Sequence, residues 1–457
     1  MRFPMPGHGA VLSTSLMAVA ASVAAVPAAQ AQTAGDGGPT VSISADLRVL
    51  AEAVEGQFRS SAPESEFFLS SRLQIEAEVD FGPVAFGGEL RDSRALSIED
   101  GSAARGSSIN TLEPLQAWAA LDFSPLGGEA RLKGGRFTQK IGSGRLVGTP
   151  GYANNIVSYA GAQLNWQRGD TEVTGFWAHP FDTLPSSRAE VHDNKVELDR
   201  VSEGETFFGV HVAQSDLFAG ATGEVFVYRL AEHDTDKVES KDRHLTTIGG
   251  RLVRKPAPGR FDFEIEAAGQ FGTVRGSAAP TDFADIDAGA AFAHVSAGWT
   301  FDSPVKPNLS LELDYATGDG RDPDHYGRFD MLFGARRALG PTGIYGPLYW
   351  GNMISPGVRF SVQPSADLDI AGTVRGAWLD SATDSFSKTG VRDASGASGS
   401  YAGTQIEARA RYWLIRKLLR LEVGGAVFAN GRFMEEAPNA SGNGDTTYGY
   451  AAVSASF

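Results

Sequence analysis

Arginine and lysine side chains recur at alternate positions of several extended segments, each time next to apolar neighbours. Because successive side chains of a strand point to opposite faces, these cations share one face of their segments. A guanidinium group grips a carboxylate with two parallel hydrogen bonds, and a ring of cations around a passage attracts anions. The pattern therefore predicts an anion-attracting surface. The cations that share this face are Arg48, Arg72, Arg91, Arg131, Lys133, Arg375, Arg409, Arg411 and Arg420.

Carboxylates occupy the same face as these cations. Opposite charges on facing strands can form ladders that only stiffen a wall, and this interpretation competes with anion conduction. The basic segments are the first few and the last few of the chain, so they can gather on one wall where a sheet closes, with the acids opposite. The carboxylates are Asp46, Glu76, Glu78, Glu89, Asp122, Glu264, Glu266, Glu312, Asp314, Asp369, Glu407 and Glu422.

The elements that carry these charges alternate between apolar and polar residues with a period of two. In one segment Leu73 and Ile75 share a face, while Arg72, Gln74 and Glu76 share the other. We count about eighteen segments of this kind, most close to the roughly ten residues that a tilted strand needs to cross a bilayer. The pattern predicts an all-β fold, a transmembrane antiparallel β-barrel of about 18 strands.

The connections between the segments alternate between long and short. Barrels of the outer membrane have long extracellular loops and short periplasmic turns, so the alternation favours this class over a soluble β-sandwich. The long connections are residues 54–65, 95–112, 138–157, 180–204, 231–243, 273–285, 319–351, 380–400 and 429–445. The short ones include residues 81–82, 124–128, 169–170, 255–259, 302–307, 364–365 and 414–417.

Composition and the N-terminus limit the class of protein further. Arg2, an apolar run over residues 10–26 and the triplet Ala29-Gln30-Ala31 predict a cleaved signal peptide over residues 1–31, followed by a barrel over residues 32–457. The chain has 0 cysteines, 55 glycines and a net charge of −15. Thiol chemistry is excluded, and the acidic balance argues against nucleic-acid binding. No later stretch is long and apolar enough for a spanning helix.

The C-terminus fits the same class. Ala451, Val453, Ala455 and Phe457 lie on one face of the last segment, and Phe457 is the last residue. A terminal aromatic strand of this kind is typical of the signal that barrel-assembly machinery reads. We therefore expect a location in the cell outer membrane, with outer-membrane lipid and this machinery as partners.

Several motifs, in order, resemble the alginate-export family of outer-membrane barrels. They include Leu132 to Phe137 followed by Gly142 to Leu146, then Asn154-Asn155, residues 267–272 and residues 311–319. The resemblance implies an eighteen-stranded barrel whose arginine-lined lumen passes an anionic polysaccharide outward. It also makes Arg136 and Arg145 candidate lining residues, although strict alternation puts Arg136 on the lipid face unless a bulge or the strand end intervenes.

The longest connection, residues 319–351, is rich in aromatic residues and contains Arg336 and Arg337. Such a loop is expected to pack over or into the barrel mouth as a gate, or against neighbouring loops. Its acidic start, residues 318–325, lacks the ligand spacing of a calcium loop, so a solvated turn is favoured over a metal site. No histidine pattern indicates a hydrolase, and no cofactor is expected.

The sequence thus predicts an outer-membrane channel for a polar, anionic substrate, with export of an alginate-like polysaccharide as its specific version. Two alternatives stay open. One is a substrate-selective uptake porin of the same fold, and the other is a non-conducting barrel that acts in adhesion or as a receptor.

Overall fold

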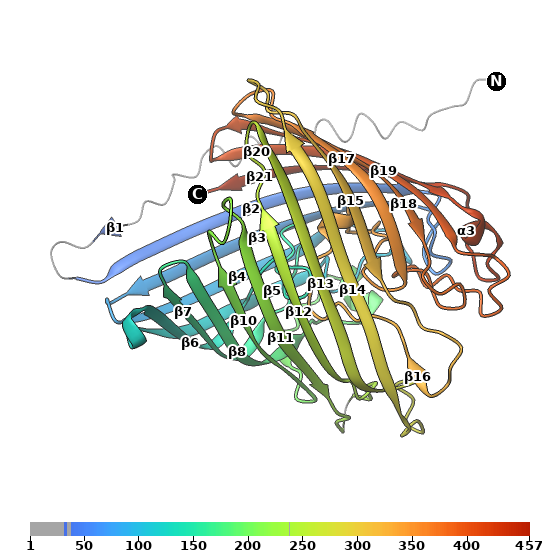
Figure 1. Cartoon of the computed structure of the whole chain (residues 1–457), viewed down its shortest axis with the longest axis horizontal. Coiled ribbons are helices and arrows are strands. Elements are labelled where there is room, and N and C mark those ends of the chain that lie inside the picture. Colours follow the sequence, from blue (N-terminus) through green and yellow to red (C-terminus); the bar gives the residue numbers. More distant parts are fainter. Residues whose placement is uncertain (1–31, 34–37, 237) are drawn as a thin grey trace.

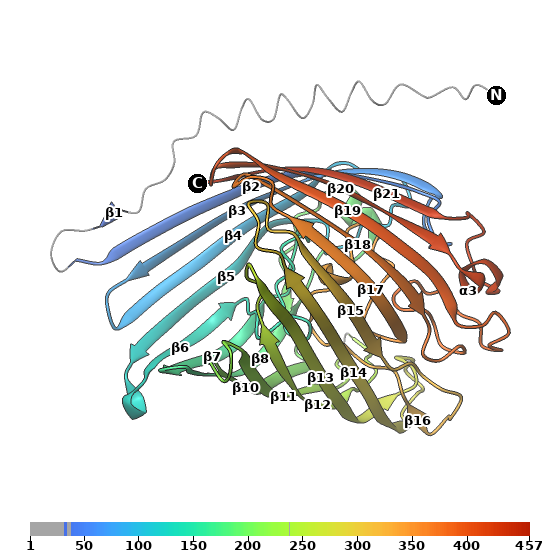
Figure 2. The same ribbon diagram turned by 45° about the horizontal axis from the view of Figure 1, so that its top comes forward.

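The chain forms one antiparallel sheet that closes on itself (Figures 1 and 2). This computed structural model describes residues 32–33, 38–236 and 238–457. The predicted signal peptide, residues 1–31, lies outside the described residues. No helix in the described part of the chain is long and apolar enough to cross a membrane.

Eighteen strands of nine to sixteen residues make up the barrel wall in the described residues. Their bounds are β2 (Thr40–Glu55), β3 (Ser65–Asp80), β4 (Val84–Ser97), β5 (Asn110–Phe123), β6 (Glu129–Phe137), β7 (Tyr159–Arg168), β8 (Thr171–Asp182), β10 (Glu205–Gln214), β11 (Thr222–Glu232), β12 (His244–Arg254), β13 (Arg260–Arg275), β14 (Asp285–Thr300), β15 (Asn308–Ala316), β17 (Met353–Val362), β18 (Leu368–Trp378), β19 (Tyr401–Ile415), β20 (Leu419–Asn430) and β21 (Thr446–Ser456).

The remaining elements are short and do not form part of the barrel wall. They are the two-residue strands β1 (Gln32–Thr33), β9 (Arg200–Val201) and β16 (His325–Tyr326), the helices α2 (Arg188–His192) and α3 (Arg432–Glu436), and the 3-10 turns η1 (Pro125–Gly127) and η2 (Arg337–Leu339).

The barrel closes where the first wall strand pairs with the last. β2 runs antiparallel to β21, with Asp46 opposite Ser456 and Glu55 opposite Thr447. The amide of Phe457 donates to the carbonyl of Ala45 at 2.8 Å, and the amide of Ala45 donates to the carbonyl of Phe457 at 3.1 Å. Closure gives each of the described wall strands a partner on both sides, which is the condition for a sheet to sit in lipid. The predicted fold class is confirmed.

The two faces of the wall differ in polarity as the alternation predicts. Apolar side chains such as Ile43 on β2, Val225 on β11 and Leu311 on β15 are 49%, 60% and 63% exposed. Residues on the other face, such as Arg48 on β2, Phe226 on β11 and Ser310 on β15, are buried. An exposed apolar belt suits a lipid environment, so the charged face is the interior.

The predicted alternation of connections is present. At one end, the short-turn end, strands are joined by turns such as residues 81–83 and 169–170. At the other, the long-loop end, the connections include residues 98–109, 183–204 and 379–400. Two further connections from this end, residues 138–158 and 317–352, run inside the barrel, and we call them the lumen loops.

A candidate anion path inside the barrel

The two lumen loops pair with each other like short strands. The amide of Gly148 donates to the carbonyl of Phe333 at 3.1 Å, and the amide of Phe333 donates to the carbonyl of Leu146 at 3.1 Å. The amide of Ala335 donates to the carbonyl of Gly144 at 2.9 Å. Most large apolar residues of the second loop, among them Phe329, Tyr345 and Trp350, are buried, Tyr345 to 0% exposure. Burial of this apolar surface explains why the loop packs inside the barrel. Packing into the barrel is one of the arrangements that the sequence predicts for this loop.

Three of the predicted lining arginines hold the first lumen loop against the wall. Arg48 donates to the carbonyl of Tyr152 at 2.7 Å and to the amide oxygen of Asn154 at 2.6 Å. Arg72 donates to the carbonyl of Ala153 at 3.1 Å. Arg91 donates to the carbonyl of Asn154 at 3.4 Å. Their charges lie inside the barrel, but many of their donors are committed to backbone oxygens.

On another wall the lumen loops meet carboxylates. Arg145 of the first loop contacts Glu264 on β13 and lies 2.6 Å from Glu266 on the same strand. The indole nitrogen of Trp350, on the second loop, donates to Asp314 on β15 at 2.9 Å. These contacts make the two loops a cross-brace between opposite parts of the barrel. Arg145 therefore takes part in an internal ion network rather than facing open solvent.

Arg375 belongs to the same acidic region. Its guanidinium donates to Asp314 at 2.9 Å and to Glu312 at 2.8 Å, and its side chain is 1% exposed. His294 lies 2.7 Å from Asp314. The structure thus separates Arg375 from Arg409 and Arg411, although all three share the interior face.

Five arginines from four parts of the chain gather around one cavity of about 290 Å³. We call this cavity the basic pocket. Glu422, Tyr450 and Tyr152 also line it. Ser454, near the end of β21, and Arg420, near the start of β20, place the pocket towards the short-turn end. Its arginines are Arg48 on β2, Arg337 on the second lumen loop, Arg409 and Arg411 on β19, and Arg420 on β20.

The basic pocket keeps an excess of positive charge. Arg411 lies 3.0 Å and Arg409 3.8 Å from Asp369, and Arg337 lies 3.5 Å from Glu407. Among the residues that line the cavity, five guanidinium groups stand against one carboxylate, Glu422. The buried Nε atoms of Arg48, Arg409 and Arg420 donate to no acceptor among the described residues. A confined cavity with this balance attracts anions.

Arg337 stays charged in this pocket. Burial opposes its charged form, but Glu407 and Tyr450 together raise the pKa of the guanidinium. Its guanidinium also stacks 5.4 Å from the ring centre of Tyr152. The sequence does not place Arg337 in this pocket, because a loop without periodicity does not reveal which wall its side chains reach. The adjacent pair Arg336 and Arg337 in an apolar loop was the signal available.

The other predicted lining residues lie away from the basic pocket. Arg131 lies 2.8 Å from Glu78, and the ammonium of Lys133 lies 4.2 Å from the ring centre of Trp118. Arg136, at the end of β6, pairs in register with Ala117. Its guanidinium contacts Glu113, lies 3.2 Å from Asp199 and stacks 3.7 Å from the ring centre of Phe181.

A bulge explains how Glu113 becomes a partner of Arg136. The pairing of β4 with β5 shifts between Glu89 and Leu90, so Glu89 lies opposite Gln116 and Leu90 opposite Pro114. The extra residue reverses the alternation beyond it, and Glu113 becomes fully buried. Arg136 is therefore a rim residue tied to the loop of residues 183–204.

A closed barrel with an apolar outer belt, a charged interior and two folded-in loops is the architecture of outer-membrane channels. The sequence pattern of the family described as alginate export matches residues 41–446. The chain belongs to this family, and the protein is accordingly a channel of the cell outer membrane. No curated protein matches the chain.

Solved structures of bacterial porins share the fold. A BenF-like porin from Pseudomonas fluorescens Pf-5 matches with a TM-score of 0.59 and 12% identity over 91% of this chain and 98% of the porin. Pseudomonas aeruginosa OccK2 (OpdF), solved in complex with glucuronate, matches with a TM-score of 0.56 and 12% identity over 91% and 96%. Pseudomonas aeruginosa OccD3 (OpdP) gives 0.55 and 12% identity over 96% of both chains.

Proposed function

We propose that this channel passes anionic, carboxylate-bearing sugars, with an alginate-like polyuronate as the specific cargo. The observation that carries the proposal is the basic pocket, whose lining sets five arginines against one carboxylate, Glu422. Guanidinium groups hold carboxylates with directed, charge-assisted hydrogen bonds, and unpaired donors favour a ligand that supplies acceptors.

The family and one structural neighbour support the same chemistry. The family description names alginate export. The OccK2 structure contains glucuronate, a sugar with one carboxylate. The role proposed here is passage without chemical conversion, since the charged groups of the pocket serve to attract and release an anion rather than to react with it.

Ion selectivity and block test the proposal directly. The refolded protein is inserted into planar bilayers, and the reversal potential is measured across a potassium chloride gradient. We expect preference for chloride and concentration-dependent block by polyuronate oligomers, with weaker block by neutral oligosaccharides of equal length. A cation-selective channel that polyuronates leave unblocked would contradict the proposal, and a barrel without conductance would favour an adhesion or receptor role.

A further inference from the structure

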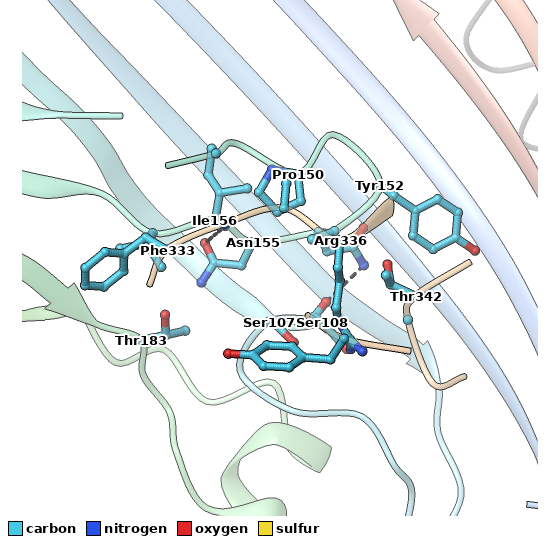
Figure 3. Close-up of a pocket in the computed structure, with 18 of the residues that line it drawn as sticks. Ser107, Ser108, Pro150, Tyr152, Asn155, Ile156, Thr183, Phe333, Arg336 and Thr342 are labelled. Carbon is cyan, nitrogen blue, oxygen red and sulfur yellow. Dashed lines mark hydrogen bonds between the residues drawn. The ribbon is translucent and has the colours of Figure 1, made fainter. Parts of the chain in front are cut away.

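A second cavity, of about 330 Å³, lies between the two lumen loops on the side of the long-loop end (Figure 3). We call it the upper cavity. Ser107 and Ser108 from residues 98–109, Thr183 from residues 183–204 and Lys388 from residues 379–400 line it together with both lumen loops. Figure 3 shows Thr183 and Phe333 on one side of the cavity and Tyr152 and Thr342 on the other.

The hydroxyl groups of the upper cavity are available to a ligand. Those of Ser107, Ser108, Thr183 and Thr342 form no hydrogen bond with any described residue, although all four residues line the space. Arg336 differs, because it donates to the carbonyls of residues 346 and 348 at 2.7 and 3.1 Å. The hydroxyl groups therefore offer neutral donors and acceptors to a ligand, whereas the guanidinium of Arg336 holds the backbone of its own loop.

One ammonium group supplies positive charge to this cavity. The ammonium group of Lys388 has no carboxylate within ion-pair distance among the described residues, and it lies 5.6 Å from the ring centre of Tyr349. Burial of the ammonium group and the nearby charges of Arg336 and Arg59 lower its pKa. An anion placed beside this group would relieve that repulsion.

Aromatic rings complete the lining. Tyr152, Phe333 and Tyr349 border the same space as the hydroxyl groups. The C–H bonds on one face of a pyranose ring form an apolar surface that packs on an aromatic ring, while the ring edge carries hydroxyl groups that need hydrogen-bond partners. Pockets for small ligands combine an apolar lining with a few polar groups in this way, at volumes upwards of about 300 Å³.

We propose that the upper cavity binds a single sugar ring that bears one carboxylate, with the carboxylate at Lys388 and the ring hydroxyls at Ser108 and Thr342. The inference rests on the proposed function for its substrate class, but it assigns a separate site. Leu50 and Tyr152 line both the upper cavity and the basic pocket. The two cavities are therefore adjacent, with these two side chains between them.

Binding of two monosaccharides to the refolded full chain tests the site. Calorimetry, supplemented by saturation-transfer NMR for weak binding, compares glucuronate with glucose, which has the same ring without the carboxylate. We expect glucuronate to bind more tightly than glucose. Lys388→Gln should weaken the affinity for glucuronate about tenfold and leave the affinity for glucose unchanged. Ser108→Ala and Thr342→Val should each weaken the affinity for both sugars about threefold or more, because each substitution removes a hydroxyl group that hydrogen-bonds the ring.

Lys306→Gln is the matched control, since Lys306 is exposed in a short turn at the opposite end. It should bind both sugars like the unmodified protein. Equal binding of glucose and glucuronate, unchanged glucuronate binding by Lys388→Gln, or absence of binding would overturn the site. The sugar-binding measurements do not depend on ion selectivity. The sugar site can therefore be refuted while the channel proves anion-selective, and a channel that is not anion-selective can still bind the sugar.

Discussion

The hydroxyl of Tyr152 lies 2.6 Å from the hydroxyl of Tyr448, and the ring of Tyr152 packs edge-on against Tyr450 at 5.4 Å between ring centres. Tyr152 belongs to the first lumen loop, whereas Tyr448 and Tyr450 belong to β21. The hydroxyl of Tyr448 also donates to Glu52 on β2 at 2.6 Å. Tyr152 is thus fixed between the basic pocket and the upper cavity, both of which it lines.

Removing the ring of Tyr152 should join the two cavities. We expect Tyr152→Ala to raise single-channel conductance about twofold or more, because a large side chain no longer narrows the path. Tyr152→Phe keeps the ring and loses only one hydrogen bond, worth about 1 kcal/mol, so its conductance should stay near that of the unmodified protein. Equal conductance of Tyr152→Ala and Tyr152→Phe would show that the path lies elsewhere.

Reversing two charges of the basic pocket should change ion selectivity. Arg409→Glu with Arg411→Glu places carboxylates where guanidinium groups face the cavity, and focused fields in a narrow lumen strengthen the effect. We expect the reversal potential to move towards cation preference and the block by polyuronate to weaken by about tenfold or more. Folding should change little because this pocket admits water.

The control for this pair makes the same charge change outside the lumen. Arg416 and Lys417 are exposed in the turn between β19 and β20. Arg416→Glu with Lys417→Glu should shift the reversal potential much less. A correctly inserted Arg409/Arg411 variant with unaltered selectivity would count against the basic pocket as the conducting route.

Arg145 should stabilise the cross-brace of the lumen loops. Its side chain is 9% exposed and Glu266 is 3% exposed, so Arg145→Ala leaves Glu266 buried without a cation, whereas Glu264 keeps Arg251 at 2.8 Å. Loss of one member of a buried ion pair costs about 3 to 5 kcal/mol. We expect lower thermal stability of the folded band in gels and noisier channel currents.

Neutralising Glu266 tests whether its unpaired carboxylate causes the loss of stability. Adding Glu266→Gln to Arg145→Ala should recover part of the stability, because a neutral amide tolerates burial without a cation. If Arg145→Ala is as stable as the unmodified protein, the ion contacts do not hold the loop.

Asp199 should make the loop of residues 183–204 sensitive to pH. Burial is the largest cause that raises the pKa of its carboxyl group, to about 6, and Glu113 adds to the effect. A raised pKa in the docked loop means that the docked state binds the proton more tightly. Docking should therefore be strongest below about pH 4 and weaken as the pH rises through 6, by at most about 1.4 kcal/mol per pH unit.

Hydrogen exchange of residues 183–204 between pH 4 and 8, corrected for the intrinsic rate, measures this dependence. Asp199→Asn cannot titrate and should remove most of it. Protection that stays constant with pH in the unmodified protein would contradict the assignment to Asp199.

The terminal residue should matter for barrel assembly. Phe457 exchanges two backbone hydrogen bonds with Ala45, which joins the last strand to the first. Deleting Phe457 should reduce the heat-modifiable, protease-resistant form in outer membranes while synthesis continues. Phe457→Tyr keeps the backbone and an aromatic ring and should assemble normally. Full assembly of the deletion would refute this role.

The sequence by itself determined the barrel, the faces of its strands and the alternation of its loops. These features are local, since alternation along a strand decides which side chains meet lipid and turn residues decide where strands end. Arg48, Arg409 and Arg411 could be assigned to the interior for this reason. The strands that carry them are far apart in sequence. The arginines of β2, β19 and β20 nevertheless line one pocket near the closure of the barrel, as the sequence predicts for the basic strands.

Only the tertiary structure decided which charges remain available. Arg72 and Arg91 share the interior face with Arg409, yet they hold backbone carbonyls of the first lumen loop. Arg337 reaches the basic pocket from a loop whose path no periodicity describes. Contacts of this kind join segments that are distant in sequence and depend on how the two lumen loops fill the barrel, so neither alternation nor composition contains them.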